Sequence, residues 1–236
     1  MATVLWAFAA AGIEATELFN AAARRALQQQ RLAHWSPRSL TSAAWAYAKL
    51  KVRASTLFDA IDVAAAGRLD EFSARELVQL LWAFARSGVS APSLFAQAAQ
   101  CATRSLADYS PAELTTLAWA FHKAALSSPR FFDALAASLV ARAFAGFDQE
   151  LLSSCLHSLA WLGVAEPALY KAAAVAAAKV IGDFTPQQLA RTVWAFAVAD
   201  ARACDECLDV LRRARARLTA TMTRLDETHT GQHKRT

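Results

Sequence analysis

Apolar positions along the chain follow a pattern that returns every 37 to 39 residues. Five copies are marked by a tryptophan followed by Ala-Phe or Ala-Tyr, and the other positions are numbered from this marker. A leucine at −5 and an aromatic residue at +2 are seven residues apart, which puts both on one face of a helix. The marker positions are Trp6, Trp45, Trp82, Trp119, His157 and Trp194, so the fifth copy carries histidine.

A second large side chain follows the first five markers at +13, where the sixth copy has a cysteine, and this constant offset predicts two helices joined by a loop of fixed length. An N-cap residue precedes the first helix, often with proline next, as in Ser110-Pro111. Glycines such as Gly88 end the first helix, and prolines such as Pro92 open the second. The +13 residues are Phe19, Phe58, Phe95, Phe132, Tyr170 and Cys207.

A helical hairpin of about 37 residues cannot bury its apolar faces alone, so neighbouring hairpins must stack. We therefore expect an all-α fold, a right-handed α-solenoid of about six helical hairpin repeats of 37–38 residues. Residues 220–236 are mostly polar, and we expect a flexible tail there. The repeat units are predicted at 1–34, 35–71, 72–108, 109–146, 147–183 and 184–219, which together form the solenoid 1–219.

Composition agrees with helix throughout, because the chain has only seven glycines and six prolines and is 56% hydrophobic. Its uncharged runs are too short to span a membrane. The formal charge of +5 is a mild basic excess, compatible with a polyanionic partner. Because the first marker is already at Trp6, we expect that a targeting segment is not part of this chain, and whether Met1 is the true start stays open.

Motifs for catalysis are absent from the sequence: it has no glycine-rich phosphate loop, no Gly-x-Ser-x-Gly and no His-Glu-x-x-His. We therefore expect neither an enzyme nor a bound cofactor. The four cysteines show no disulfide framework. Cys204 and Cys207 form a lone CxxC, but 21 residues separate Cys207 from His229, too many for a zinc finger, so no metal site is expected. We predict instead that Cys207 is a core residue.

Two further positions of the first helix, −3 and +4, also lie on one face. The −3 residues are all polar and change from copy to copy: Thr3, Ser42, Gln79, Thr116, Ser154 and Arg191. In the second to fourth copies the +4 residues are basic: Lys49, Arg86 and Lys123. This pattern suits single-stranded RNA, with the −3 row at base edges and the +4 cations at phosphates. The alternative is an ordinary solvated face.

Two other features leave alternatives open. Four arginines crowd the last helix, where they could bind phosphate or form a solvated cap of the array. The marker tryptophans could wedge between adjacent first helices, or Trp45, Trp82 and Trp119 could stack on RNA bases. The arginines of this cluster are Arg212, Arg213, Arg215 and Arg217.

The first helices resemble those of a known family. Leu40-Thr-Ser-Ala-Ala-Trp-Ala-Tyr-Ala-Lys-Leu50 and Leu77-Val-Gln-Leu-Leu-Trp-Ala-Phe-Ala-Arg86 are similar to the repeats of the heptatricopeptide and octotricopeptide repeat proteins, which are related to proteins that end in an RAP domain. The resemblance covers residues 1–219, and no RAP-like domain follows them. It implies an α-solenoid that acts on RNA in mitochondria, or alternatively in chloroplasts.

What the resemblance implies about function is transcript or rRNA maturation or stabilisation, or a place in an organellar ribosome. The partners it implies are single-stranded or ribosomal RNA and other proteins of an organellar ribonucleoprotein. A second class stays open, a protein scaffold in a large organellar complex with little RNA contact. The variable polar row favours RNA binding, whereas the modest charge and the small number of repeats favour the scaffold.

Overall fold

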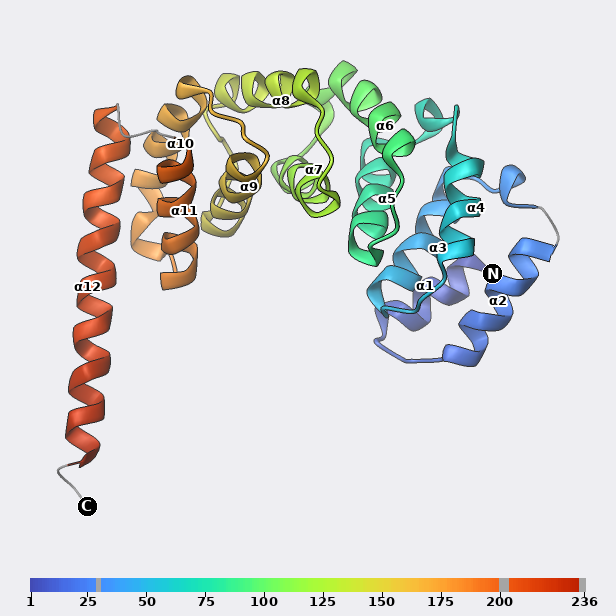
Figure 1. The fold of residues 1–236 in the computed structure, drawn as a ribbon, viewed down its shortest axis with the longest axis horizontal. Helices are drawn as coiled ribbons and strands as arrows, with labels where there is room; N and C mark the ends of the chain where they lie inside the picture. Colours follow the sequence, from blue (N-terminus) through green and yellow to red (C-terminus); the bar gives the residue numbers. More distant parts are fainter. Residues whose placement is uncertain (29–30, 200–203, 234–236) are drawn as a thin grey trace. The chain divides into compact units, whose positions relative to one another are not determined.

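The computed structural model describes residues 1–28, 31–199 and 204–233 of the chain. Twelve α-helices and four short 3-10 helices make up this part, and it contains no strand (Figure 1). The contacts divide the chain into two compact units, Met1–Leu135 and Ala136–Thr236, with the boundary inside one helix, α8. The two units are described separately below.

Unit 1 contains four first helices, each followed by a second helix. First helices pack side by side in chain order, α1 on α3, α3 on α5 and α5 on α7. The first helices are α1 (Ala2–Ala10), α3 (Pro37–Lys49), α5 (Ala74–Ser87) and α7 (Pro111–Ala124). The second helices are α2 (Thr16–Gln28), α4 (Ser55–Ala65), α6 (Pro92–Arg104) and the part of α8 (Pro129–Ala141) up to Leu135. The 3-10 helices of this unit are η1 (Arg31–His34), η2 (Leu69–Glu71) and η3 (Leu106–Asp108).

Unit 2 repeats the arrangement with α9 (Gln149–Trp161), α10 (Pro167–Val180), η4 (Ile181–Asp183), α11 (Pro186–Val198) and α12 (Asp205–His233). First helix α9 packs on first helix α11, and α10 packs on α12. Stacked hairpins in both units confirm the all-α solenoid prediction. The predicted tail, residues 220–236, begins inside α12, and its last three residues lie outside the described part. Its flexibility stays a prediction.

The first helices begin where the N-cap prediction puts them. The cap side chain accepts a hydrogen bond from the backbone N–H three residues later, which satisfies one of the donors left free at a helix start. In α5, for example, Ser73 Oγ accepts from Glu76 N, and the Glu76 carboxylate accepts from Ser73 N in return. The five capping residues are Ser36, Ser73, Ser110, Asp148 and Thr185.

Aromatic pairs join each repeat to the next within a unit. The +13 ring of one repeat meets the +2 ring of the following one, edge to face, with centroids 4.9–6.0 Å apart. At the first junction the Tyr47 hydroxyl also donates to the Phe19 carbonyl oxygen at 2.6 Å, and burial raises the pKa of Tyr47 to about 12. The pairs are Phe19–Tyr47, Phe58–Phe84, Phe95–Phe121 and Tyr170–Phe196, and these side chains are buried as predicted.

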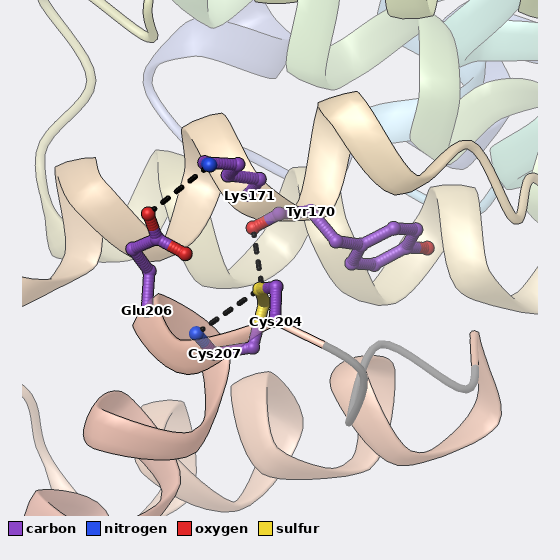
Figure 2. The surroundings of a disulfide bond; sticks show 5 residues. All are labelled: Tyr170, Lys171, Cys204, Glu206 and Cys207. Carbon is purple, nitrogen blue, oxygen red and sulfur yellow. Dashed lines mark hydrogen bonds and ion pairs between the residues drawn. A yellow bond between two sulfur atoms is a disulfide. The ribbon is translucent and has the colours of Figure 1, made fainter.

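The sixth repeat ends this series with a cysteine pair. Cys207 is fully buried, which confirms the core prediction, and its Sγ lies 3.6 Å from the Tyr170 carbonyl oxygen. Figure 2 shows it bonded to Cys204, so the expectation that the cysteines pair in no disulfide needs correction. The cause is local: Cys204 immediately precedes α12, and its Cα lies 5.4 Å from that of Cys207, within disulfide reach. An ion pair between Lys171 and Glu206, at 3.2 Å, lies beside the bridge (Figure 2).

Two other expectations concern what the chain lacks. Within the described ranges, no group of His, Cys, Asp or Glu side chains is placed to hold a metal ion. No helix there combines the length and the apolar character needed to cross a membrane.

Candidate nucleic-acid interface

From α3 onward, each first helix presents four positions on one face: −7, −3, the marker and +4. They are spaced by four, three and four residues, so they follow one another along the helix surface. We call them together the first-helix stripe. In unit 1 the stripe of α3 is Arg38, Ser42, Trp45 and Lys49; that of α5 is Arg75, Gln79, Trp82 and Arg86; that of α7 is Ala112, Thr116, Trp119 and Lys123.

The predicted RNA-contacting residues of unit 1 are accessible. Thr3 is exposed, and Ser42, Gln79 and Thr116 are half-buried. The Thr116 hydroxyl donates to the Ala112 carbonyl at 2.8 Å, which leaves its oxygen lone pairs for other partners. The +4 cations Lys49, Arg86 and Lys123 are accessible too, and none of them forms an ion pair within the described part of the chain. Their contact with RNA stays a prediction.

The marker tryptophans of unit 1 form a ladder. Ring centroids of consecutive markers are 6.3, 6.5 and 6.4 Å apart, from Trp6 through Trp45 and Trp82 to Trp119, with the planes inclined by 30–33°. The packing interpretation of the marker is therefore confirmed. Because neighbouring rings already touch at this spacing, no base fits between them. RNA can meet only the outer edge of the ladder.

Two hollows lie on the stripe side of unit 1, with volumes of about 430 and 420 Å³. We name them the Trp6 hollow and the Trp45 hollow after their first marker residue. Each contains the marker tryptophan of one repeat. From the first helix two repeats further along the chain, each also contains the N-cap serine, the glutamate of the capping box and the −3 residue. Both also include Arg75 and Gln79. The residues used below are Trp6, Arg38, Ser42, Ser73, Glu76 and Gln79 in one, and Trp45, Arg75, Gln79, Ser110, Glu113 and Thr116 in the other. The second set is the first moved on by one repeat.

The charges in these hollows are of two kinds. Arg38 and Arg75 are cationic, and neither guanidinium forms an ion pair or hydrogen bond within residues 1–28, 31–199 and 204–233. The carboxylates are engaged: Glu76 Oε2 accepts from Ser73 N at 3.0 Å, and Glu113 Oε2 accepts from Ser110 N at 2.8 Å. The sequence interpretation missed position −7, although it lies four residues from the −3 row on the same face.

The stripe of unit 2 has a different chemistry. In α9 the −7 residue is Glu150, whose carboxylate pairs with Arg191 of α11 at 3.5 Å and accepts from Gln188 Nε2 at 2.7 Å. The predicted base-reading residue Arg191 is thus in an ion pair, while Ser154 is half-buried. The His157 ring lies 4.8 Å from that of Trp194. Burial lowers the pKa of His157, and the positive charge of Arg191 lowers it further.

The arginine cluster of α12 is only partly available. Arg213 pairs with Asp209 at 2.8 Å, and Arg217 donates to the carbonyl oxygen of Ile181. Arg212 and Arg215 are exposed and line a shallow hollow of about 510 Å³. Two of the four predicted phosphate contacts, Arg212 and Arg215, are therefore exposed without an ion pair to a described residue.

Stacked hairpins with one varied face define the class of this molecule, a helical-repeat protein. Over residues 1–228 the chain matches the family described as RNA-editing substrate-binding complex 6 protein, and it belongs to that family. No curated protein matches the chain.

The family that matches is not the one predicted from the first helices. It is a helical-repeat family associated with RNA, as expected, but the match is not to the heptatricopeptide or octotricopeptide proteins. The residues behind that resemblance explain the difference. Leu40, Leu77, Tyr47 and Phe84 are core residues, and the markers pack on one another. Such positions serve to stack hairpins of this length, so they identify the architecture better than the family.

Proposed function

We propose that the protein is an RNA-binding subunit of a mitochondrial RNA-editing assembly and holds single-stranded RNA on the first-helix stripe of unit 1. The observation that carries the proposal is the charge of this stripe. It has five accessible cations, none in an ion pair with a described residue, and no carboxylate. Phosphates attract such cations, and varied polar side chains beside them meet the bases. The cations are Arg38, Lys49, Arg75, Arg86 and Lys123.

The family match supports the part of this proposal that concerns RNA editing. Its description refers to substrate binding in RNA editing, so we assign the protein to transcript maturation, by RNA binding and without catalysis of its own. Nothing comparable supports the organellar ribosome or the chloroplast.

A second candidate function is that of a protein scaffold, and the stripe of unit 2 favours it. Trp161, Trp194 and Val198 there are 49%, 38% and 51% exposed. Exposed aromatic side chains are typical of protein interfaces. The two functions are compatible, because they use different units.

The test of RNA binding is a titration of a labelled single-stranded RNA of mixed sequence by fluorescence anisotropy, over a series of salt concentrations. Changing the five stripe cations to glutamine should weaken binding to every sequence. It should also lower the slope of log K against log salt by about 0.7 for each phosphate that is no longer neutralised.

The matched control removes the same charge from other sites of unit 1. It should leave affinity and salt slope close to those of the unchanged protein. Equal reductions in both variants would mean that only net charge matters, and an unchanged protein that binds no RNA would refute the proposal. The control positions are Arg24, Arg25, Lys51, Arg53 and Arg130.

A further inference from the structure

We infer that the Trp6 and Trp45 hollows each hold one nucleotide of the RNA, with Arg38 and Arg75 as the groups that bind its phosphates. This inference rests on the proposed function and goes beyond it, because it assigns the phosphate contacts to position −7 instead of +4.

The first argument is the repetition of the site. The two hollows have nearly the same volume, about 430 and 420 Å³, and most of their residues correspond one repeat apart. They differ in that the Trp6 hollow also contains Arg75, whose counterpart in the Trp45 hollow is Ala112. Volumes of this order suit a small ligand. RNA carries one phosphate per nucleotide at a regular spacing, so it suits a surface on which an arginine recurs from one repeat to the next. Arg75 and Gln79 line both hollows, so the two sites adjoin.

The second argument is the chemistry of the anion site. A guanidinium presents a planar fork of N–H donors that binds a phosphate through two parallel hydrogen bonds. Arg38 and Arg75 have no competing partner in the described part of the chain. The N-cap serines beside them are occupied, because Ser73 Oγ and Ser110 Oγ each donate to the glutamate of their own helix at 2.7 Å. The arginines are therefore the phosphate-binding groups of the hollows.

The carboxylates set the orientation of the nucleotide. Glu76 and Glu113 line the hollows, and their charge repels a phosphate. The base, which carries amino and imino donors, is the part that can lie against them and against the −3 side chains. In the Trp45 hollow these are Gln79, whose amide both donates and accepts, and Thr116.

The third argument separates the two cation rows. Positions −7 and +4 are eleven residues apart, which corresponds to roughly 16 Å along a helix. One phosphate cannot touch both. Lys49, Arg86 and Lys123 line neither hollow. Along their helices they follow the marker tryptophan, whereas the arginines at −7 precede it.

The experiment compares two double variants of the full chain with a fluorescein-labelled eight-nucleotide RNA of mixed sequence. Arg38→Gln with Arg75→Gln removes the charges of the hollows, and Lys49→Gln with Arg86→Gln removes the same charge from the same two helices outside them. We expect the first variant to bind at least about ten-fold more weakly, with a salt slope reduced by about 1.4 because two phosphates are no longer neutralised. The second should change affinity less than about three-fold.

A third variant, Arg38→Lys with Arg75→Lys, keeps the charge but removes the planar fork. An intermediate affinity supports the inference, because the phosphate contact is bidentate. The mutated side chains lie outside the buried core, so thermal unfolding followed by circular dichroism should be unchanged in all variants.

Three outcomes would count against the inference. Equally weakened binding in the two glutamine variants would show that RNA crosses the whole stripe without binding in the hollows. An unaffected Arg38/Arg75 variant would refute the inference and leave the proposed function standing, provided that removal of all five cations still weakens binding. If the unchanged protein does not bind RNA, both the inference and the proposed function are refuted.

Discussion

At the scale of single residues, one position in each of the first five repeats has left-handed backbone whatever side chain occupies it. Position +6 holds glycine in three described repeats, but Lys51 with φ 57° in the second and Ala125 with φ 54° in the fourth. The marker and the +13 residue are thirteen positions apart in all of these repeats, so the connection between the two helices imposes this turn on residues that disfavour it. The glycines at this position are Gly12, Gly88 and Gly163, with φ between 69° and 78°.

Ala125→Gly should therefore stabilise the protein. Relief of the left-handed strain exceeds the extra entropy that glycine gives the unfolded chain, and we expect a gain of about 0.5–1 kcal/mol in the free energy of unfolding. Urea denaturation measures it. Gly88→Ala should cost a similar amount, although nothing lies within 4 Å of the position of its Cβ. The control Ala124→Gly, one residue earlier within α7, should be destabilising. A destabilised Ala125→Gly variant would contradict this account.

At the scale of elements, the repeats of a unit are joined by two systems of rings. The tryptophan ladder connects first helices near the surface, and the edge-to-face pairs connect a second helix to the next first helix in the core. Phe58 and Phe84 are both fully buried, with centroids 5.0 Å apart and planes at 88°. The pair thus adds a directional contact to the burial of both rings.

A double-mutant cycle should detect this contact. With Phe58→Leu and Phe84→Leu, we expect a coupling free energy of about 0.5–1.5 kcal/mol between the two changes. The control cycle uses Phe19→Leu and Phe84→Leu, whose rings belong to different pairs, and these destabilisations should add to within about 0.5 kcal/mol. Additive effects in both cycles would mean that the rings stabilise by burial alone.

Much of this was readable from the sequence, because the core depends on side chains at fixed offsets. The caps, the helix starts and the buried leucines such as Leu114 follow from local rules. The hollows do not follow from local rules, because each combines residues of three successive repeats. The pairing of Arg191 with Glu150 is likewise a contact between repeats. The left-handed backbone of Ala125 follows from the fixed offset between the two helices of a repeat, which overrides the preference of the residue.

At the scale of the whole molecule, the two units carry different versions of the same stripe. The stripe of unit 1 has five cations that form no ion pair with a described residue, whereas the stripe of unit 2 has the ion pair of Glu150 with Arg191. Trp161 and Trp194 of unit 2 are exposed, as is Trp6 at the start of unit 1. On our proposal, unit 1 binds RNA and unit 2 makes the contacts with partner proteins.

Crosslinking to RNA that contains 4-thiouridine, followed by peptide mass spectrometry, should reflect this division. We expect crosslinked peptides from α3, α5 and α7, and few from α9 and α11. Competition with unlabelled RNA of the same sequence provides the control. Crosslinks concentrated in α9 and α11, or near Arg212 and Arg215 of α12, would place the RNA on a surface other than the stripe of unit 1.

The edge-to-face pairs also have an evolutionary consequence. Because the +13 ring of one repeat fits the +2 ring of the next, a duplicated repeat meets suitable partners on both sides. Unequal recombination within the gene can therefore lengthen the array by one period of about 37 residues without a new core. Each such event adds one more hollow to the row, so the length of RNA held can evolve separately from the stability of the fold.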